Sequence, residues 1–367
     1  MPRTLAPRLI PLSIACAIAL AAGCAGGFPD GVIYPSITPQ TGQPRLVTHE
    51  FTFEGAPVTI DVVVDGGLYA GAAAAAKTVT RFGNARENDW IEDYYPAFVD
   101  EEHQEAFYAN VLTAFRNVRT ERSLDADRYA ELLVVFVQSL TYETDPVDLL
   151  PKYPVETFVE GVGDCDDKSL LLAALLSREG YSVSVLLFEP EQHVALGIRS
   201  AGDGYANSGY DFIETTAPAF VGMVPDSFAG GITLESDPRV IPIGSGDVRF
   251  GAADQVDAIL EAITRALASA EDLAAEIRAA DAALATLEGE VTSERARLDG
   301  LRNSGQTSAY NASVDAYNAL VAEYNTAIAE RNALAGQYNA LSEIDRLVVN
   351  GLDDRTGTYA RVVTGSR

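Results

Sequence analysis

The 367-residue chain has few lysines and few histidines. It contains three of each, and its 26 Lys and Arg residues are outnumbered by 53 Asp and Glu residues, which gives a formal net charge of −27. This balance argues against a nucleic-acid binder, because phosphate binding depends on clustered Lys and Arg. An acidic, lysine-poor surface suits a salty or extracytoplasmic setting, where charge preserves solubility. The length allows two domains.

Several cofactor signatures are also missing. The sequence has no phosphate-binding loop, no dinucleotide-binding motif and no cluster of zinc ligands. Asp164, Asp166 and Asp167 are candidate calcium ligands, but the further ligands and the glycine of an EF-hand loop are absent. Capping of a helix explains these aspartates better. We therefore predict no cofactor and no metal.

The N-terminus has the pattern of an export signal. Two arginines precede the apolar stretch Leu9–Ala22, and the segment ends in Leu20-Ala-Ala-Gly-Cys24. This ending resembles the lipobox of prokaryotic lipoproteins, in which the cysteine is lipidated and becomes the mature N-terminus, although the leucine lies one position earlier than usual. We predict a signal peptide at residues 1–23, lipidation of Cys24 and a tether at 24–45. An uncleaved anchor or a nearby cleavage site is the alternative; in every case the bulk of the protein is expected outside the cell, at the membrane.

Cysteine is scarce, with Cys16, Cys24 and Cys165 as the only three. Cys16 lies in the predicted signal and Cys24 would carry lipid, so the mature protein would keep one free thiol and no intramolecular disulfide. A lone thiol in an exported chain is a candidate reactive group. A buried, inert cysteine is the alternative, and the sequence around Cys165 decides between the two.

Residues 46–250 predict an α+β domain. Two strand-like runs open it, a mostly helical region follows, and residues 142–162 are expected to form a loop. A helix from Asp164 to about Arg178 then precedes three strands. The expected strands are 46–53, 58–64, 181–188, 193–198 and 210–215. The pattern indicates a small, mostly antiparallel sheet, and a Gly- and Pro-rich stretch at 218–246 closes the domain.

The composition changes to Ala, Glu, Arg and Leu after Gly251. Residues 251–348 predict an α-helical antiparallel coiled-coil hairpin that turns near Gly305, followed by a tail at 349–367. Its second helix repeats Tyr-Asn every seven residues, with the tyrosines on the seam. The pairs are Tyr310-Asn311, Tyr317-Asn318, Tyr324-Asn325 and Tyr338-Asn339. We favour a hairpin packed on itself; an arm that binds a coiled-coil partner or oligomerises is the alternative.

The segment Gly161-Val-Gly-Asp164-Cys165 places the lone thiol at the start of a buried helix. Asp164 is a good N-cap, and Asp167 three residues later suggests a capping box. In the first turn, the helix dipole and free N–H groups favour a thiolate at Cys165 and can hold an oxyanion. The neighbouring aspartates oppose this effect, so a thiolate needs a cationic partner.

His193 is the candidate for that partner. It begins an apolar strand and can point from the edge of the sheet toward the helix N-terminus, where an imidazole would activate the thiol. Glu214, expected on the next strand, can orient the imidazole. Asp211 is the alternative acid, but the two-residue period of a strand puts it on the face opposite to Glu214.

These motifs together resemble the transglutaminase-like superfamily. The residues that carry the resemblance are Tyr153-Pro-Val-Glu-Thr157, Gly163-Asp-Cys-Asp-Asp167, the strand at His193, and Ile213-Glu-Thr-Thr216. They are similar to the archaeal lipoprotein or membrane-bound branch with a Gly-Asp-Cys-[Glu/Asp]-Asp motif. The resemblance covers about residues 46–235 and implies a papain-like core with catalytic Cys165, His193 and Glu214, and with Thr216 in place of the family's threonine. The chain departs from the family in having Glu-Thr-Thr for Asp-Pro-Thr, and Val194 where many members carry an aromatic residue.

The sequence therefore predicts a lipid-anchored, cysteine-dependent acyl-transfer enzyme that acts on a protein or peptide. Water as the acceptor would make it a peptidase or amidase, and an amine would make it a cross-linking transglutaminase; no residue decides between these. The alternative is a non-catalytic surface scaffold that binds a partner through its helical hairpin.

Overall fold

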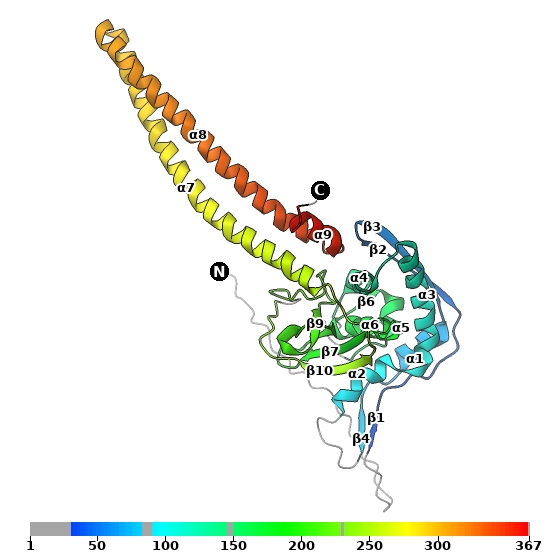
Figure 1. Cartoon of the computed structure of the whole chain (residues 1–367). Coiled ribbons are helices and arrows are strands. Elements are labelled where there is room, and N and C mark those ends of the chain that lie inside the picture. Colours follow the sequence, from blue (N-terminus) through cyan, green and yellow to red (C-terminus); the bar gives the residue numbers. More distant parts are fainter. Residues whose placement is uncertain (1–30, 83–89, 145–149, 229–230, 366–367) are drawn as a thin grey trace, which may run out of the picture. The chain divides into compact units, whose positions relative to one another are not determined.

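The computed structural model describes residues 31–82, 90–144, 150–228 and 231–365 (Figure 1). The predicted signal peptide, Cys16 and Cys24 lie outside these residues. The chain divides into two units, Met1–Asp257 with Leu352–Arg355, and Ala258–Gly351 with Thr356–Arg367. No helix in the described ranges has the length and apolar character needed to cross a membrane. Mixed α and β structure followed by a long helical region is confirmed.

The two strands predicted at 46–53 and 58–64 are present in the first unit and pair with each other. β2 (Arg45–Phe53) and β3 (Ala56–Val64) pair in antiparallel register, from Arg45 opposite Val64 to Phe53 opposite Ala56. Alternate residues of β3 are buried, because successive side chains of a strand point to opposite faces. The strand prediction for this region is confirmed.

Residues 31–44, assigned above to the tether, are part of this unit. β1 (Gly31–Ile33) pairs with β4 (Thr80–Phe82), and Ile37 is 2% exposed in the core. The backbone N–H of Gln40 donates to the carbonyl of Gly67 at 2.9 Å. The Gly- and Pro-rich composition suggested a flexible segment; its backbone instead finds partners in β4 and at the start of α1.

Helices form the next part of the unit. They are α1 (Gly66–Ala74), α2 (Ile91–Val99), the short η1 (Glu102–Gln104), α3 (Glu105–Glu121) and α4 (Ala126–Ser139). The stretch 142–162, expected to be a loop, contains α5 (Pro154–Glu160). Pro154 starts this helix, and Glu156 accepts a 2.9 Å hydrogen bond from the backbone N–H of Tyr153. Proline is well suited to a first helical position, so Pro154 marks a helix start.

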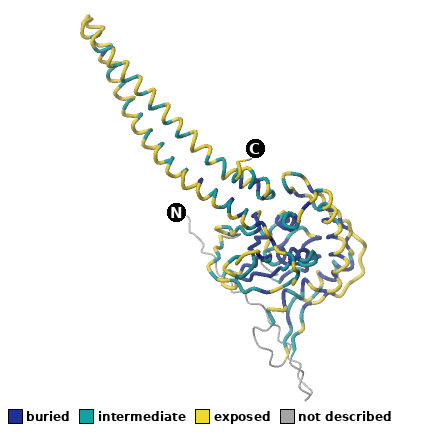
Figure 2. The backbone as a smooth tube through the Cα atoms, viewed as in Figure 1, coloured by how far each residue is buried: buried dark blue, intermediate teal, exposed yellow. Residues whose placement is uncertain are grey.

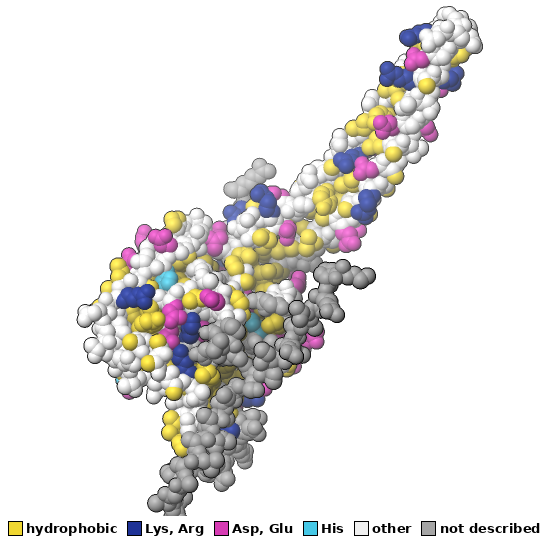
Figure 3. Space-filling view, turned by 180° about the vertical axis from the view of Figure 1, so that it is seen from behind, with side chains coloured by type: hydrophobic (Ala, Val, Ile, Leu, Met, Phe, Trp, Pro, Cys, Tyr) yellow, Lys and Arg dark blue, Asp and Glu magenta, His cyan; other side chains and the backbone are white. Residues whose placement is uncertain are grey.

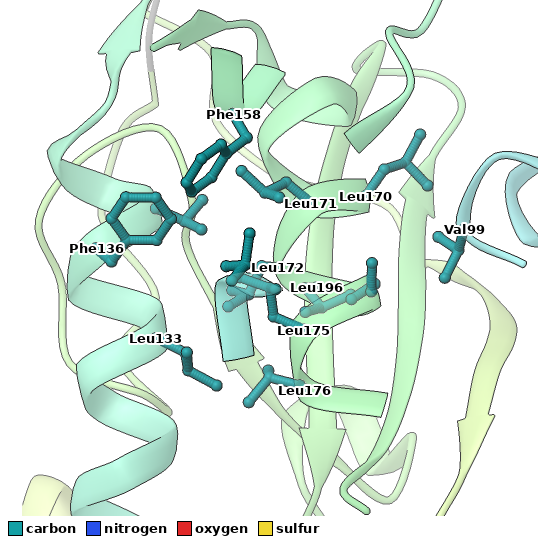
Figure 4. Packing of buried hydrophobic residues seen from close by; sticks show 14 of the residues in the cluster. Val99, Leu133, Phe136, Phe158, Leu170, Leu171, Leu172, Leu175, Leu176 and Leu196 are labelled. Atoms are coloured by element: carbon teal, nitrogen blue, oxygen red, sulfur yellow. The ribbon is translucent and has the colours of Figure 1, made fainter. Parts of the chain in front are cut away.

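The centre of the unit is α6 (Cys165–Arg178), which follows the short strand β6 (Val162–Gly163). Its apolar residues from Leu170 to Leu176 are fully buried. Figure 4 shows Leu171, Leu172 and Leu175 packed between α4, with Phe136, and the sheet, with Leu196. Each buried leucine contributes about 1.5 to 3 kcal/mol, so this packing fixes the position of the helix and of the thiol at its start.

The sheet has the strand order β10-β7-β8-β9, and all its pairs are antiparallel. Its strands are β7 (Ser182–Phe188), β8 (His193–Arg199), β9 (Tyr210–Ile213) and β10 (Arg239–Ser245), with the short helix η2 (Tyr205–Asn207) before β9. A mostly antiparallel sheet was predicted, but β10 was missed because Gly and Pro dominate its surroundings. Its register shifts after Pro242, and β10 is an edge strand, where proline is tolerated.

Both faces of this sheet are covered. Val194, Leu196 and Ile198 of β8 belong to the main core that contains α6. Ala195 belongs to a second cluster, together with Phe212, Phe228 and four partly buried residues, Tyr205, Ile232, Leu234 and Val240. All of β8 except Arg199 is therefore buried, His193 included.

The second unit contains a helical hairpin, formed by α7 (Ala253–Asn303) from Ala258 onward and by α8 (Thr307–Val349). The two helices are joined at Gly305, whose φ of 73° favours glycine. Asp281 and Arg331 pair at 2.8 Å between the two helices, which shows that they run antiparallel. Figure 2 shows mostly half-buried and exposed residues along it, and Figure 3 shows apolar side chains among charged ones.

The Tyr-Asn repeat divides between the seam and the surface of the hairpin. Tyr310, Tyr317 and Tyr324 are half-buried, whereas Tyr338 is exposed, and every asparagine of the four pairs is exposed. The tyrosine positions thus match the predicted seam over three of the four repeats. We call the exposed residues Asn311, Asn318, Asn325 and Asn339 the asparagine edge of α8.

The predicted tail contains α9 (Arg355–Val362) and a segment that joins the first unit. Leu352–Arg355 belong to that unit, where the backbone carbonyl of Asp353 accepts a 2.9 Å bond from the N–H of Glu54. Arg355 and Glu131 form a buried ion pair. Burial raises the pKa of Glu131 to about 7, against the opposing effect of Arg355.

Candidate functional site

The glycines before Cys165 have separate structural roles. Gly161 ends α5 in the left-handed conformation, with φ of 68°. Gly163 pairs with Tyr142 of β5 (Thr141–Tyr142) in a short parallel ladder. A Cβ atom on Gly163 would lie 2.6 Å from the Cβ of Asp167, so only glycine allows the chain to pass here. The motif thus ends one helix and starts the next within four residues.

The predicted capping box at the start of α6 is confirmed. Asp164 accepts a 3.2 Å hydrogen bond from the N–H of Asp167, and Asp167 accepts a 3.3 Å bond from the N–H of Asp164. Asp167 also accepts a 2.6 Å bond from the N–H of Lys152. Burial, followed by the charge of Asp164, raises the pKa of Asp167 to about 7. These two aspartates hold the backbone on which Cys165 is placed.

Cys165 is partly buried, and its pKa is raised well above the usual value of a thiol. Burial is the main cause, followed by the negative charges of Asp166 and Asp164. Backbone N–H groups of Val194 and Asp166 oppose the shift by hydrogen bonding to the sulfur. Burial and the two aspartates therefore destabilise a thiolate at Cys165 more than the hydrogen bonds from backbone N–H groups stabilise it. Cys165 rests as a neutral thiol unless a base takes its proton.

The Asp164, Cys165 and Asp166 side chains lie close together. One ligand atom from each lies within 4.8 Å of the others. The pKa of Asp166 is raised well above its usual range, chiefly by burial and then by the charge of Asp164, which also hydrogen-bonds to it. Asp164 is already engaged in the helix cap, and Asp166 is the carboxyl beside the thiol whose charged form is disfavoured.

His193 begins β8 and is 4% exposed. Its ring packs against Phe228, with the ring centroids 4.7 Å apart. Its Nε2 atom lies 3.5 Å from Glu214 Oε2, and neither atom has a closer hydrogen-bond partner. This distance is long for a hydrogen bond but suits a charge pair once the imidazole is protonated.

Glu214 lies one residue beyond the end of β9, whereas the sequence placed it within the strand. This position lets its carboxylate turn back: Oε1 accepts a 2.6 Å hydrogen bond from the N–H of Thr216 and a second bond from the Thr216 hydroxyl. Burial alone would raise the pKa of Glu214, but the contact with His193 and the two hydrogen bonds from Thr216 outweigh it, and the pKa is lowered. Glu214 is held ionised toward His193.

Asp211, the alternative acid, occupies a different environment. It lies opposite Ile198 in the ladder between β8 and β9, and its side chain hydrogen-bonds to Ser200. Burial is the main cause that raises its pKa, and the charges of Asp257 and Asp254 add to the shift. The carboxylate that contacts His193 is that of Glu214.

The three predicted residues are brought to one region, with one contact missing. Cys165 lies against the backbone of Val194, next to His193, and His193 contacts Glu214. No hydrogen bond joins Cys165 to His193 in the described part of the chain.

Two tyrosines that the sequence did not single out surround the site. Burial, followed by the charges of Cys165, Asp164, Asp166 and Glu214, raises the pKa of Tyr142 to about 12. Tyr95 of α2 is affected in the same direction by burial, Asp166 and Cys165. Tyr142 thus lies near both the thiol of Cys165 and the carboxylate of Glu214. No local motif marks either tyrosine, because each reaches the site only through the fold.

Comparisons with protein-family models, with curated proteins and with solved structures find no match to this chain. The arguments about function therefore depend on the residues and their geometry.

Proposed function

We propose that the protein is a transglutaminase-like, cysteine-dependent acyl-transfer enzyme in which Cys165 is the nucleophile, His193 the base and Glu214 the orienting acid. The observation that carries the proposal is the buried His193–Glu214 contact, with Nε2 and Oε2 3.5 Å apart, beside a cysteine at the start of a buried helix. A helix-start nucleophile, a base on a following strand and an acid after the next strand have the order of a papain-like core. The carboxylate is positioned to stabilise an imidazolium.

The raised pKa of Cys165 determines how the first step proceeds. His193 takes the thiol proton as sulfur attacks the carbonyl carbon of a carboxamide or peptide, and Glu214 stabilises the resulting imidazolium. N–H groups at the start of α6 are candidates for holding the oxyanion. The C–N bond then breaks, and the imidazolium gives its proton to the leaving amine or ammonia.

The second step releases the thioester formed on Cys165. Water attacks the thioester carbon in hydrolysis, and a primary amine attacks it in transamidation, with His193 accepting a proton from the attacking group. The C–S bond then breaks, and the imidazolium returns the proton to the sulfur of Cys165. The expected substrate is a protein or peptide. Export and lipidation at Cys24 would place this reaction at the outer surface of the membrane.

A surface scaffold is the second candidate, because the electrostatics beside Cys165 disfavour its thiolate. In that case the hairpin would be the working part, through the exposed asparagine edge of α8. Catalysis remains our proposal, since a silent site needs no buried carboxylate aimed at a buried histidine.

Glu214, which follows β9, and Asp211, which lies within it, provide a test with a matched control. Ammonia release from glutamine-containing peptides is measured for Glu214→Gln and Asp211→Asn, with Cys165→Ala as the inactive reference. We expect a loss of about 100-fold for Glu214→Gln and little change for Asp211→Asn. A larger loss for Asp211→Asn, or ammonia release that survives Cys165→Ala, would remove the assignment.

A further inference from the structure

Lys168 is the one lysine of the chain with no exposed surface in the structure. It lies in the first turn of α6, three residues after Cys165, and its ammonium group donates to the backbone carbonyls of Leu140 at 2.9 Å and Gln138 at 3.4 Å. A lysine is almost never fully buried unless it is paired. The mechanism above does not use this charge.

Gln138 connects the Lys168 contact to the acid of the proposed triad. While its backbone carbonyl accepts from Lys168, its side-chain amide donates to the carbonyls of Glu214 at 2.8 Å and Ala219 at 3.0 Å. Both amide bonds are buried, and they fix the two ends of the turn that follows β9. The neighbouring residues are also joined, since the hydroxyls of Ser169 and Thr215 lie 3.1 Å apart.

The charge of Lys168 acts on the same acid. Burial lowers the pKa of Lys168 to about 8, and the negative charge of Glu214 opposes that shift. Three other groups face Glu214: His193 on β8, Tyr142 on β5, and Thr216, which donates two hydrogen bonds. Lys168 therefore adds a positive charge from α6 to a carboxylate that is otherwise held by β8 and by its own turn.

We propose that Lys168 and Gln138 are positioning residues that hold the Glu214 carboxylate, ionised and correctly placed, against His193. Gln138 fixes the backbone of the turn, and Lys168 supplies the compensating charge while anchoring Gln138 itself. This inference is based on the proposed function, because it assigns both residues a part in activating Cys165.

A purely structural role for Lys168 makes a different prediction. Gln138 and Leu140 lie at the C-terminal end of α4, and a cation there stabilises a helix. Loss of such a cap would lower stability and activity regardless of what residue 214 is. A positioning role requires that the effect on the thiol depends on Glu214.

A double-mutant cycle separates the two roles. The full chain is prepared as wild type, Lys168→Met, Glu214→Gln and the double variant, and alkylation of Cys165 by iodoacetamide is followed by mass spectrometry of its peptide. We expect Lys168→Met to slow alkylation about tenfold in the wild-type background and less than about twofold in the Glu214→Gln background. Equal slowing in both backgrounds would overturn the proposal.

The pH dependence of alkylation gives a second readout. Without the positive charge, Glu214 should take up a proton at higher pH. The fall in the alkylation rate of Cys165 on acidification should therefore occur at a higher pH in Lys168→Met than in wild type; this fall is called the acidic limb of the profile. Lys77→Met is the matched control, because Lys77 pairs with Glu156 and does not face Glu214; its limb should not move. An unmoved limb in Lys168→Met would contradict the role of the charge.

Two further variants cover the cases in which Lys168→Met does not fold or the proposed function itself is wrong. If Lys168→Met does not unfold cooperatively, Gln138→Met replaces it in the cycle and should show the same dependence on Glu214. His193→Ala is measured alongside. Wild-type alkylation in that variant would refute the proposed function, whereas slow alkylation with an additive Lys168 cycle would refute only the positioning role.

Discussion

Helices α6 and α8 differ in how much of each helix is buried. In α6, 10 of 14 residues are buried, and they include Asp167, Lys168 and Ser169. In α8, which has 43 residues, Val348 is the only buried one. A helix enclosed by the fold can hold charged groups in fixed positions, whereas a helix with one seam mainly keeps its partner helix in register. The candidate chemistry is accordingly found around α6.

Leucine-to-alanine substitutions test this comparison most strongly. Leu171→Ala in α6 should lower the free energy of unfolding of the first unit by about 3 to 5 kcal/mol, because a fully buried leucine leaves a cavity. Leu320→Ala in α8 should cost about 1 kcal/mol, because that side chain is only half-buried. Urea denaturation of the full chain, followed by fluorescence and circular dichroism, measures both. Equal costs would show that the two helices are packed alike.

The buried ion pair between Arg355 and Glu131 gives the next largest effect. Arg355→Met should lower the free energy of unfolding by about 3 kcal/mol at pH 8, because it leaves a buried carboxylate without its partner. The pKa of Glu131 is raised to about 7 in the folded protein, so stability contributed by this group is present at low pH and is lost as the pH rises toward 7. Removal of Arg355 should raise that pKa further.

The cost of Arg355→Met should therefore be small at pH 5, where Glu131 is protonated, and large at pH 8. Chemical denaturation at the two pH values measures the difference, and Glu131→Gln in the same background should recover stability at pH 8. A cost that does not change with pH would mean that the charge of Glu131 has little influence.

The smallest expected effect is the difference in stability cost between substituting a tyrosine and substituting an asparagine of the Tyr-Asn repeat. Tyr317→Ala removes a half-buried ring from the seam and should cost about 1 to 2 kcal/mol in the hairpin. Asn318→Ala changes an exposed position and should cost less than about 0.5 kcal/mol. Amide hydrogen exchange in α8 reports the local stability. A larger loss for Asn318→Ala would assign the asparagine edge a structural or binding role.

Local patterns made much of this structure predictable from the sequence. The capping box of α6 needs only Asp164 and Asp167, and the strand β8 follows from its continuous apolar run. The turn at Gly305 follows from the ends of two helical repeats. In each case the residues that determine the element lie within it.

The remaining features depend on residues far apart in the sequence. β10 forms because β7 offers a partner about 55 positions earlier, and Ile37 is buried by the fold despite its Gly- and Pro-rich surroundings. At the site, the raised pKa of Cys165 depends chiefly on burial, which the motif does not reveal. The roles of Lys168 and Gln138 likewise appear only when α4, α6 and the end of β9 are brought together.

The dependence of Cys165 alkylation on His193 tests the central claim most directly. The rate with iodoacetamide is measured from pH 5 to pH 9 for wild type and His193→Ala, by mass spectrometry of the Cys165 peptide. Because burial and the neighbouring aspartates raise the pKa of the thiol, the account predicts slow alkylation without the imidazole and a rate at least about tenfold higher at pH 7 with it. Identical profiles for the two chains over the whole pH range would contradict it.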